Sequence, residues 1–132
     1  MPITGFYAAL FALMLIWLSF QVINQRRKNR VPVGDGGVQD LMRAQGAHTN
    51  FCQYVPFALL LMACAEAGDA WALAIHGLGA GMVVGRLCHA KGLLGEQKTF
   101  TMRITGMQLT FAVLGLGAAL NLYLAALRLL AT

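Results

Sequence analysis

Charged residues are scarce in this chain of 132 residues, and acidic residues are the rarest of them. Five acidic and ten basic residues make up 11% of the sequence, whereas 58% of the residues are hydrophobic. A soluble domain carries roughly a quarter of charged residues, so this composition argues against a soluble protein. The length corresponds to a single domain over residues 1–132.

Potential metal ligands and disulfide partners are also few. The three cysteines form no CxxC pair and no two of them are four residues apart, and the three histidines do not fall at ligand spacing with one another. These residues are Cys52, Cys64, Cys88, His48, His76 and His89. We therefore predict neither a disulfide framework nor a metal site, and interpret the cysteines as small core residues.

The first apolar run has no charged residue between positions 1 and 23 and is followed at once by NQRRKNR. At about 1.5 Å per residue, a helix of this length crosses the ~30 Å hydrocarbon core of a membrane. A cleavable signal peptide would have basic residues before the apolar run and a small-residue cleavage site after it. Because neither feature is present, we expect a retained transmembrane helix.

Three more apolar runs follow, and the four runs predict helices over about 3–24, 39–66, 70–91 and 101–130. A water-soluble four-helix bundle is the alternative, but its helices would need a polar stripe. The first and fourth runs have almost no polar stripe. The predicted fold is therefore all-α, an integral membrane four-helix bundle.

Basic residues are concentrated around two of the three connections between these helices. Nine of the ten lie there: Arg26, Arg27, Lys28, Arg30, Arg43, Arg86, Lys91, Lys98 and Arg103. The remaining connection holds Glu66 and Asp69 and no base. The positive-inside rule puts the basic connections in the cytoplasm and both termini outside. This asymmetry accounts for the net charge of +5, so we infer no nucleic-acid partner and expect contact with anionic lipid headgroups.

Polar residues gather where the second apolar run begins, in the sequence HTNFCQYVPF. On a helix, Arg43, Asn50 and Tyr54 fall within about 40° of one another, and Gln53 lies about 60° from Asn50. Pro56 follows inside the apolar run, where a proline tends to kink a helix and open space. Since polar groups are costly to bury in lipid, the grouping suggests a polar cleft.

Further basic residues occur at the same end of the third and fourth runs. Arg86 and His89 are one turn apart, and Arg103 stands near the start of the last helix. The simpler interpretation is that such residues snorkel to the membrane interface. An arginine this deep in an apolar run, however, usually faces a polar cavity and needs an anionic partner. The few acidic residues of the chain do not supply this anionic partner, so we expect a bound ligand to supply it.

These motifs resemble those of the membrane-associated proteins in eicosanoid and glutathione metabolism, the MAPEG family. The resemblance is carried by RRKNRV, HTNFCQYVPF, GRLCHAKG and TMRITG and covers nearly the whole chain. Its most specific element is Asn50 followed by Gln53, Tyr54 and Pro56. The short chain and its first connection are similar to the bacterial members of the family, so an inner membrane location is expected.

The resemblance implies a homotrimer of four-helix subunits, with glutathione bound between neighbouring subunits near the cytoplasmic face. By position, Arg30, Asn50, Gln53 and Tyr54 would hold the tripeptide. Arg86 and His89 match positions on the family's third helix, and Arg103 matches the arginine that stabilises the glutathione thiolate.

The sequence departs from the family pattern at three positions. Gly46 stands where the family usually has an arginine, and Arg43, one turn earlier on the same face, is the candidate substitute. Gln53 replaces a glutamate, and Leu93 replaces a tyrosine often found on the third helix. These departures bear on glutathione affinity and activity rather than on the fold.

The function implied is that of a glutathione-dependent transferase or peroxidase acting on lipophilic electrophiles from the bilayer. The attacking species is the thiolate, and a free thiol with a pKa of ~8.5 is only a few per cent ionised at neutral pH. An arginine beside the sulfur lowers that pKa by ~1–3 units, the role expected of Arg103. The alternative is a non-catalytic membrane protein of the same fold that binds lipid or a protein partner.

Overall fold

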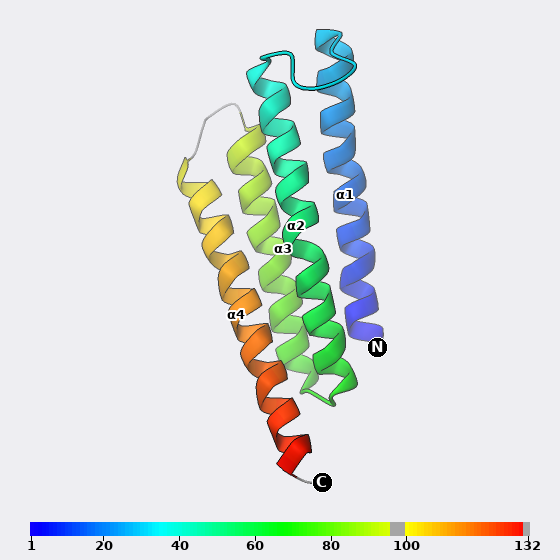
Figure 1. The fold of residues 1–132 in the computed structure, drawn as a ribbon, viewed down its shortest axis with the longest axis vertical. Coiled ribbons are helices and arrows are strands. Elements are labelled where there is room, and N and C mark those ends of the chain that lie inside the picture. The colour runs from blue at the N-terminus through cyan, green and yellow to red at the C-terminus, as the bar shows by residue number, and fades with distance from the viewer. Residues whose placement is uncertain (96–99, 131–132) are drawn as a thin grey trace.

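The computed structural model describes residues 1–95 and 100–130, which form four α-helices (Figure 1). The helices are α1 (Pro2–Asn29), α2 (Gln39–Ala67), α3 (Ala72–Leu94) and α4 (Phe100–Leu130). Consecutive helices run in opposite directions, so both termini lie toward one end of the bundle (Figure 1). The predicted all-α four-helix bundle is confirmed.

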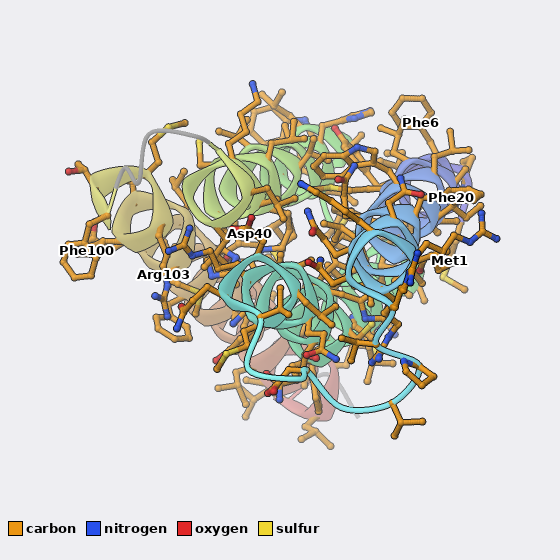
Figure 2. All side chains as sticks on the ribbon, turned by 90° about the horizontal axis from the view of Figure 1, so that it is seen from above. Met1, Phe6, Phe20, Asp40, Phe100 and Arg103 are labelled. Atoms are coloured by element: carbon orange, nitrogen blue, oxygen red, sulfur yellow. The ribbon has the colours of Figure 1, made fainter. Side chains whose placement is uncertain are left out.

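All four helices are long and apolar enough to cross a membrane. Large apolar side chains cover the outside of the bundle, including Phe6, Leu13 and Phe20, which are all more than half exposed. Phe6 projects away from the neighbouring helices when the bundle is viewed along its length (Figure 2). Exposed apolar surface on this scale requires a covering phase, which for an integral membrane protein is the lipid.

The two ends of the bundle differ in charge. The basic end comprises the α1–α2 connection, the end of α3 and the start of α4; the acidic end comprises both termini and the α2–α3 turn (Figure 1). The described residues of the basic end include Arg26, Arg27, Lys28, Arg30, Arg43, Lys91 and Arg103, and those of the acidic end include Glu66 and Asp69. Lys98, assigned above to a basic connection, lies outside the described residues.

Helix α1 continues five residues beyond its predicted end at position 24. Its last turn contains Arg26, Arg27 and Lys28, and basic side chains stabilise the negative end of a helix dipole. The helix ends at Asn29 and is capped by Arg30, which has a left-handed conformation (φ 55°). The Val31 N–H then donates to the Arg26 carbonyl at 3.1 Å. At 28 residues, α1 is about 42 Å long and exceeds the ~30 Å membrane core.

Helix α2 is continuous through Pro56, the residue expected to kink it. The proline is exposed on the outside of the helix. Together with Phe11 and Phe51 it lines an apolar groove of about 270 Å³ between α1 and α2. The extra space expected near the proline is therefore on the outer surface of the bundle rather than in its core.

A close approach of α3 and α4 organises the basic half of the bundle. A Cβ added to Gly106 would lie 2.5 Å from the backbone nitrogen of His89 and 2.6 Å from the Gly85 carbonyl oxygen. Real Cβ contacts are not that short, so glycine is the residue that allows the two backbones to meet here. Small residues serve the same purpose in many membrane helix pairs. The contact holds His89 and the start of α4 at fixed positions.

Candidate functional site

A cleft of about 250 Å³ opens at the basic end of the bundle, between α2, α3 and α4. It is lined by Met42, Arg43, Gly46, Asn50, His89, Leu93 and Arg103. A smaller hollow of about 140 Å³ adjoins it and adds Phe100 to the lining. Arg103 lies on the side of α4 that faces α2 (Figure 2). Four of the site residues predicted from the sequence thus meet at one cleft: Arg43, Asn50, His89 and Arg103.

The cleft carries more positive than negative charge. Arg43 and Arg103 both line it, and the ion pair described at this end joins Arg43 Nη1 to Asp40 Oδ1 at 3.7 Å. The two side chains are 30% and 63% exposed, and an ion pair this open to solvent is worth at most about 1 kcal/mol. Among the described residues, Arg43 is therefore only weakly held by its acidic partner and could also meet an anionic ligand.

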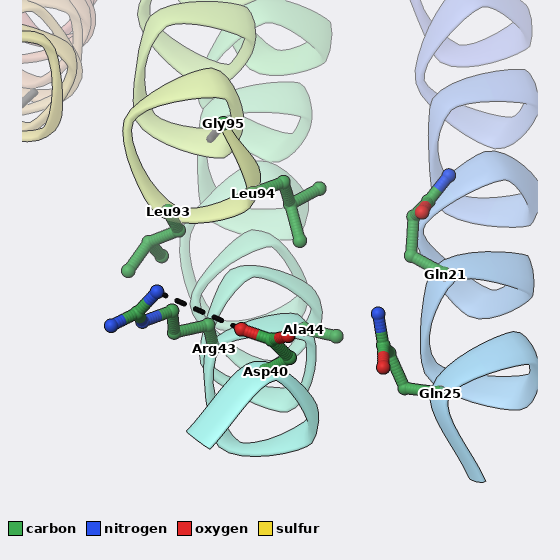
Figure 3. Close-up of a pocket in the computed structure, with 8 residues that line it drawn as sticks. All are labelled: Gln21, Gln25, Asp40, Arg43, Ala44, Leu93, Leu94 and Gly95. Carbon is green, nitrogen blue, oxygen red and sulfur yellow. Dashed lines mark ion pairs between the residues drawn. The ribbon is translucent and has the colours of Figure 1, made fainter. Parts of the chain in front are cut away.

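Arg43 also borders a separate cavity within the helix bundle. This cavity has a volume of about 210 Å³ and lies between α1, α2 and the end of α3 (Figure 3). The amides of Gln21 and Gln25 face it from α1, and Asp40 and Leu94 face it from the other side (Figure 3). Because Arg43 and Leu93 line both spaces, these two side chains form the wall between the inner cavity and the outer cleft.

Arg86 lies behind the cleft rather than in its lining. Its side chain is only 2% exposed. The guanidinium donates to Asn50 Oδ1 and to Thr110 Oγ1, and more weakly to the Gly106 carbonyl at 3.4 Å. Its Nε is buried without a hydrogen-bond partner among the described residues. The guanidinium thus joins α3 to both α2 and α4 directly beneath Asn50.

Tyr54 belongs to the same supporting layer. The Arg86 guanidinium carbon lies 5.7 Å from the centroid of the Tyr54 ring, which is a cation–π distance. The Tyr54 ring also packs edge to face against that of Phe111, with 5.7 Å between the ring centroids. Tyr54 is half-buried, and it packs against Arg86 rather than lining the cleft.

Two predicted site residues lie on the outer surface, away from the cleft. Gln53 is exposed on the outside of α2, and Arg30 is exposed at the end of α1. Neither belongs to the lining of the cleft. The 60° offset of Gln53 from Asn50 is large enough to turn it out of the cleft, although both residues are on one helix.

A second polar cleft lies on the other side of α2, against α1. It has a volume of about 340 Å³ and is lined by Ser19, Val22, Ile23, Arg26, Gln45, His48 and Thr49. His48 Nε2 is 3.2 Å from Ser19 Oγ, and its Nδ1 is 3.9 Å from the sulfur of Cys52. Sequence reasoning missed this cleft, because its residues come from two helices and Ser19 stands alone in an apolar run.

Thr110 was also missed. It is fully buried, donates to the Gly106 carbonyl at 2.8 Å and accepts from Arg86. A threonine inside an apolar helix gives no spacing signal of its own. The available hint was Arg86, a buried cation that must find acceptors on neighbouring helices.

The fold and the cleft define an integral membrane four-helix bundle with a basic polar site at one end. Comparison with known proteins makes the class specific: the sequence profile of the MAPEG family matches residues 4–123. The chain is 36% identical over 121 residues to the inner membrane protein YecN of Escherichia coli K12, covering 92% of this chain and 91% of YecN. YecN of an Escherichia coli O6:H1 strain matches equally well. This protein belongs to the MAPEG family.

Proposed function

We propose that this protein is a glutathione-dependent transferase or peroxidase of the bacterial inner membrane that acts on lipophilic electrophiles. The observation that carries the proposal is the cation-lined cleft at the basic end. Glutathione has a net charge of about −1 as the thiol at neutral pH, and a cleft that contains Arg43 and Arg103 suits such a ligand. The membrane-embedded surface beside the cleft gives lipophilic electrophiles direct access from the bilayer.

Arg103 is the residue proposed to act on the sulfur. It lines the cleft and is exposed, so its guanidinium is free to approach a bound thiol. Placed there, the cation lowers the thiol pKa and raises the thiolate fraction; a drop of ~2 units raises it roughly twentyfold at neutral pH. Part of this gain is offset because nucleophilicity falls as the pKa falls.

Asn50 and His89 are proposed to hold the tripeptide beside Arg103. Asn50 lines the cleft and its amide is restrained by Arg86. His89 lines the cleft and is only 4% exposed, so its position is fixed by the packing around it. A restrained amide loses little conformational freedom when a ligand binds, which favours affinity.

We place the complete site between subunits of a homotrimer. In a ring of identical subunits, one surface of each subunit meets a different surface of the next. The cleft on α2, α3 and α4 and the cleft on α1 and α2 are two such surfaces, and both lie at the basic end. Arg30 and Gln53 are exposed and line neither cleft, so in this proposal they reach the ligand from the surface of a neighbouring subunit. Native mass spectrometry from mild detergent tests it, and a monomer or dimer would contradict it.

The cleft is proposed to face the cytoplasm, where glutathione is found, with both termini outside. The charge difference between the two ends supports this orientation. Introducing Asp69→Cys places a thiol at an exposed position of the acidic end. A membrane-impermeant thiol reagent should label this variant from outside intact cells above the level of the parent chain, whose three native cysteines provide the background. Labelling from the cytoplasmic side alone would contradict the orientation.

Isothermal titration of the purified protein with glutathione is the test of the function itself. Binding in the millimolar range or tighter, together with turnover of a test electrophile, is the expected result. Ultraviolet difference spectra across pH then report the pKa of the bound thiol. A folded protein that binds no glutathione would contradict the proposal.

One observation favours the alternative of a non-catalytic protein with the same fold. Gly46 lines the cleft and contributes no side chain, and nothing lies within 4 Å of where its Cβ would be. The cleft is therefore wider and less basic than one with an arginine at that position. Glutathione binding without turnover of any electrophile would favour this alternative.

A further inference from the structure

The hydrogen bond between Arg86 and Asn50 determines which end of the Asn50 amide faces the cleft. An asparagine side chain has one acceptor, Oδ1, and one donor group, Nδ2, and the two have nearly the same shape. Arg86 has donors only. Turning the Asn50 amino group toward Arg86 would therefore place two donors face to face in a buried environment, which is costly.

Thr110 also presents an acceptor to Arg86, from the α4 side. Its hydroxyl donates to the Gly106 carbonyl at 2.8 Å, so its lone pairs are left to accept from the Arg86 guanidinium. The Gly106 carbonyl is a further acceptor at 3.4 Å. With its acceptors arranged around it, the guanidinium holds one orientation, and Oδ1 of Asn50 is one of the atoms that it requires.

We propose that Arg86 is a positioning residue that makes Asn50 a hydrogen-bond donor toward the cleft. The ligand group that meets Asn50 must then be an acceptor: a carboxylate or a peptide carbonyl rather than an amine. This inference rests on the proposed glutathione site, and it specifies how that site selects one end of a peptide ligand. It also gives the buried charge of Arg86 a role without direct ligand contact.

The first test replaces the amide by a carboxylate of the same shape. Asn50→Asp keeps an acceptor for Arg86 but turns an acceptor toward the ligand, whereas Asn50→Ala removes both. By calorimetry, Asn50→Asp should weaken glutathione binding about tenfold or more, and more than Asn50→Ala does. If Asn50 only satisfied Arg86, the order would be reversed, since the aspartate keeps that bond. That reversed order would overturn the proposal.

The charge of the new carboxylate needs its own control. Gln108→Glu adds the same charge on an exposed position of α4 that is outside the cleft lining. It should change glutathione affinity by less than about twofold, as expected for a screened surface charge. An equal loss of affinity in Gln108→Glu and Asn50→Asp would mean that charge alone explains the result, and would overturn the proposal.

A second test needs no ligand. Thermal unfolding in detergent is compared for Asn50→Asp in the wild-type chain and in the Arg86→Gln variant. With Arg86 present, the carboxylate should leave the melting temperature unchanged or raise it, because it pairs with the buried cation. With Arg86→Gln, the same change should lower it. Equal effects in both backgrounds would overturn the claim that Arg86 orients Asn50.

The two tests separate this inference from the proposed function. A wild type that binds no glutathione overturns the proposed function and the ligand selection inferred here, while the unfolding cycle still decides the orientation of Asn50. A wild type that binds glutathione but shows no coupling in the cycle keeps the proposed function and overturns the inference.

Discussion

The carboxylates Glu66 and Asp69 at the acidic end of the bundle are paired within the chain, whereas arginines at the basic end face an open cleft. The Glu66 carboxylate accepts from the backbone N–H groups of Ile3 and Thr4 at 3.0 and 2.8 Å. Helix α1 has no side-chain cap of its own, so a residue of α2 satisfies donors that the first turn leaves free. On the same end, Arg128 pairs with Asp69 at 3.4 Å.

At the basic end, the buried Arg86 and the arginines that line the cleft differ in their pairing. Arg86 is enclosed by Asn50, Thr110 and the Gly106 carbonyl. Above this layer, Arg43 and Arg103 face the cleft, where Arg43 has one weak partner in Asp40. The two ends therefore differ in how far their charges are paired within the chain, and the proposed ligand site is at the end where the arginines are less paired.

The largest effect is expected from disturbing the layer beneath the cleft. Gly106→Ala places a methyl group 2.5 Å from the backbone nitrogen of His89. Overpacking of this kind lowers the free energy of unfolding by up to about 3 kcal/mol. Gly115→Ala on the same helix meets nothing within 4 Å and should be neutral or stabilising by about 0.5 kcal/mol. Unfolding in detergent measures both. Equal stabilities would show that α3 and α4 are not in close contact here.

Removing one arginine from each end tests the comparison directly. Arg103→Ala should leave glutathione binding nearly normal but lower the thiolate fraction roughly twentyfold at neutral pH, since the thiol pKa returns toward ~8.5. Turnover should fall by less than this, because the more basic thiolate is the better nucleophile. Arg103→Lys should recover part of the charge effect but not the planar geometry. Arg128→Ala, at the acidic end, should leave turnover unchanged. Thiolate spectra across pH provide the measurement, and an unaltered thiol pKa in Arg103→Ala would remove Arg103 from the mechanism.

Glu66→Ala should affect stability and not function. Loss of a cap that satisfies helix N–H groups costs about 1–2 kcal/mol, and the site is at the other end of the bundle. Asp69→Asn is the matched control, because it removes an exposed ion pair worth at most about 1 kcal/mol, while asparagine tolerates the left-handed backbone at this position (φ 59°). Stability should fall in the first variant and hardly in the second, with glutathione affinity the same in both. A marked loss of affinity in Glu66→Ala would weaken the division between the two ends.

The smallest expected effect is a gain in affinity for glutathione. Gly46→Arg adds a cation to the cleft at a position where nothing lies within 4 Å of the new Cβ. Glutathione should bind about two- to fivefold more tightly, as expected for one solvent-exposed ion pair. Gly5→Arg, at an equally open position of the acidic end, should not change affinity. Titration of both variants with glutathione decides whether position 46 belongs to the binding surface.

Much of the fold was predictable because long apolar runs in a sequence indicate membrane-spanning helices. The predicted ends of the second helix and of the fourth lie within one residue of those of α2 and α4. Helix geometry also placed Arg43 and Asn50 on one face, and both line the cleft. Rotation about one axis is a local property, so it is readable from spacing alone.

Predictions that involved a second helix were less complete. Arg86 was expected to face a cavity and lack an anion, and its deep position was recognised, but its acceptors were not. Those acceptors come from α2 and α4, 36 and 24 positions away in the chain. Thr110 and Ser19 carried no signal, since a single hydroxyl in an apolar run is common in membrane helices.

By itself, the sequence determined the four spans, the charge difference between the two ends and membership of the MAPEG family, because apolar length, charge order and short motifs are properties of a linear chain. Tertiary structure alone decided which charges are paired. The Glu66 cap on α1 joins residues more than 60 positions apart, and the Gly106 contact depends on the distance between two backbones. Such distances follow from how the helices pack, and packing is what leaves Arg43 and Arg103 at an open cleft while it encloses Arg86.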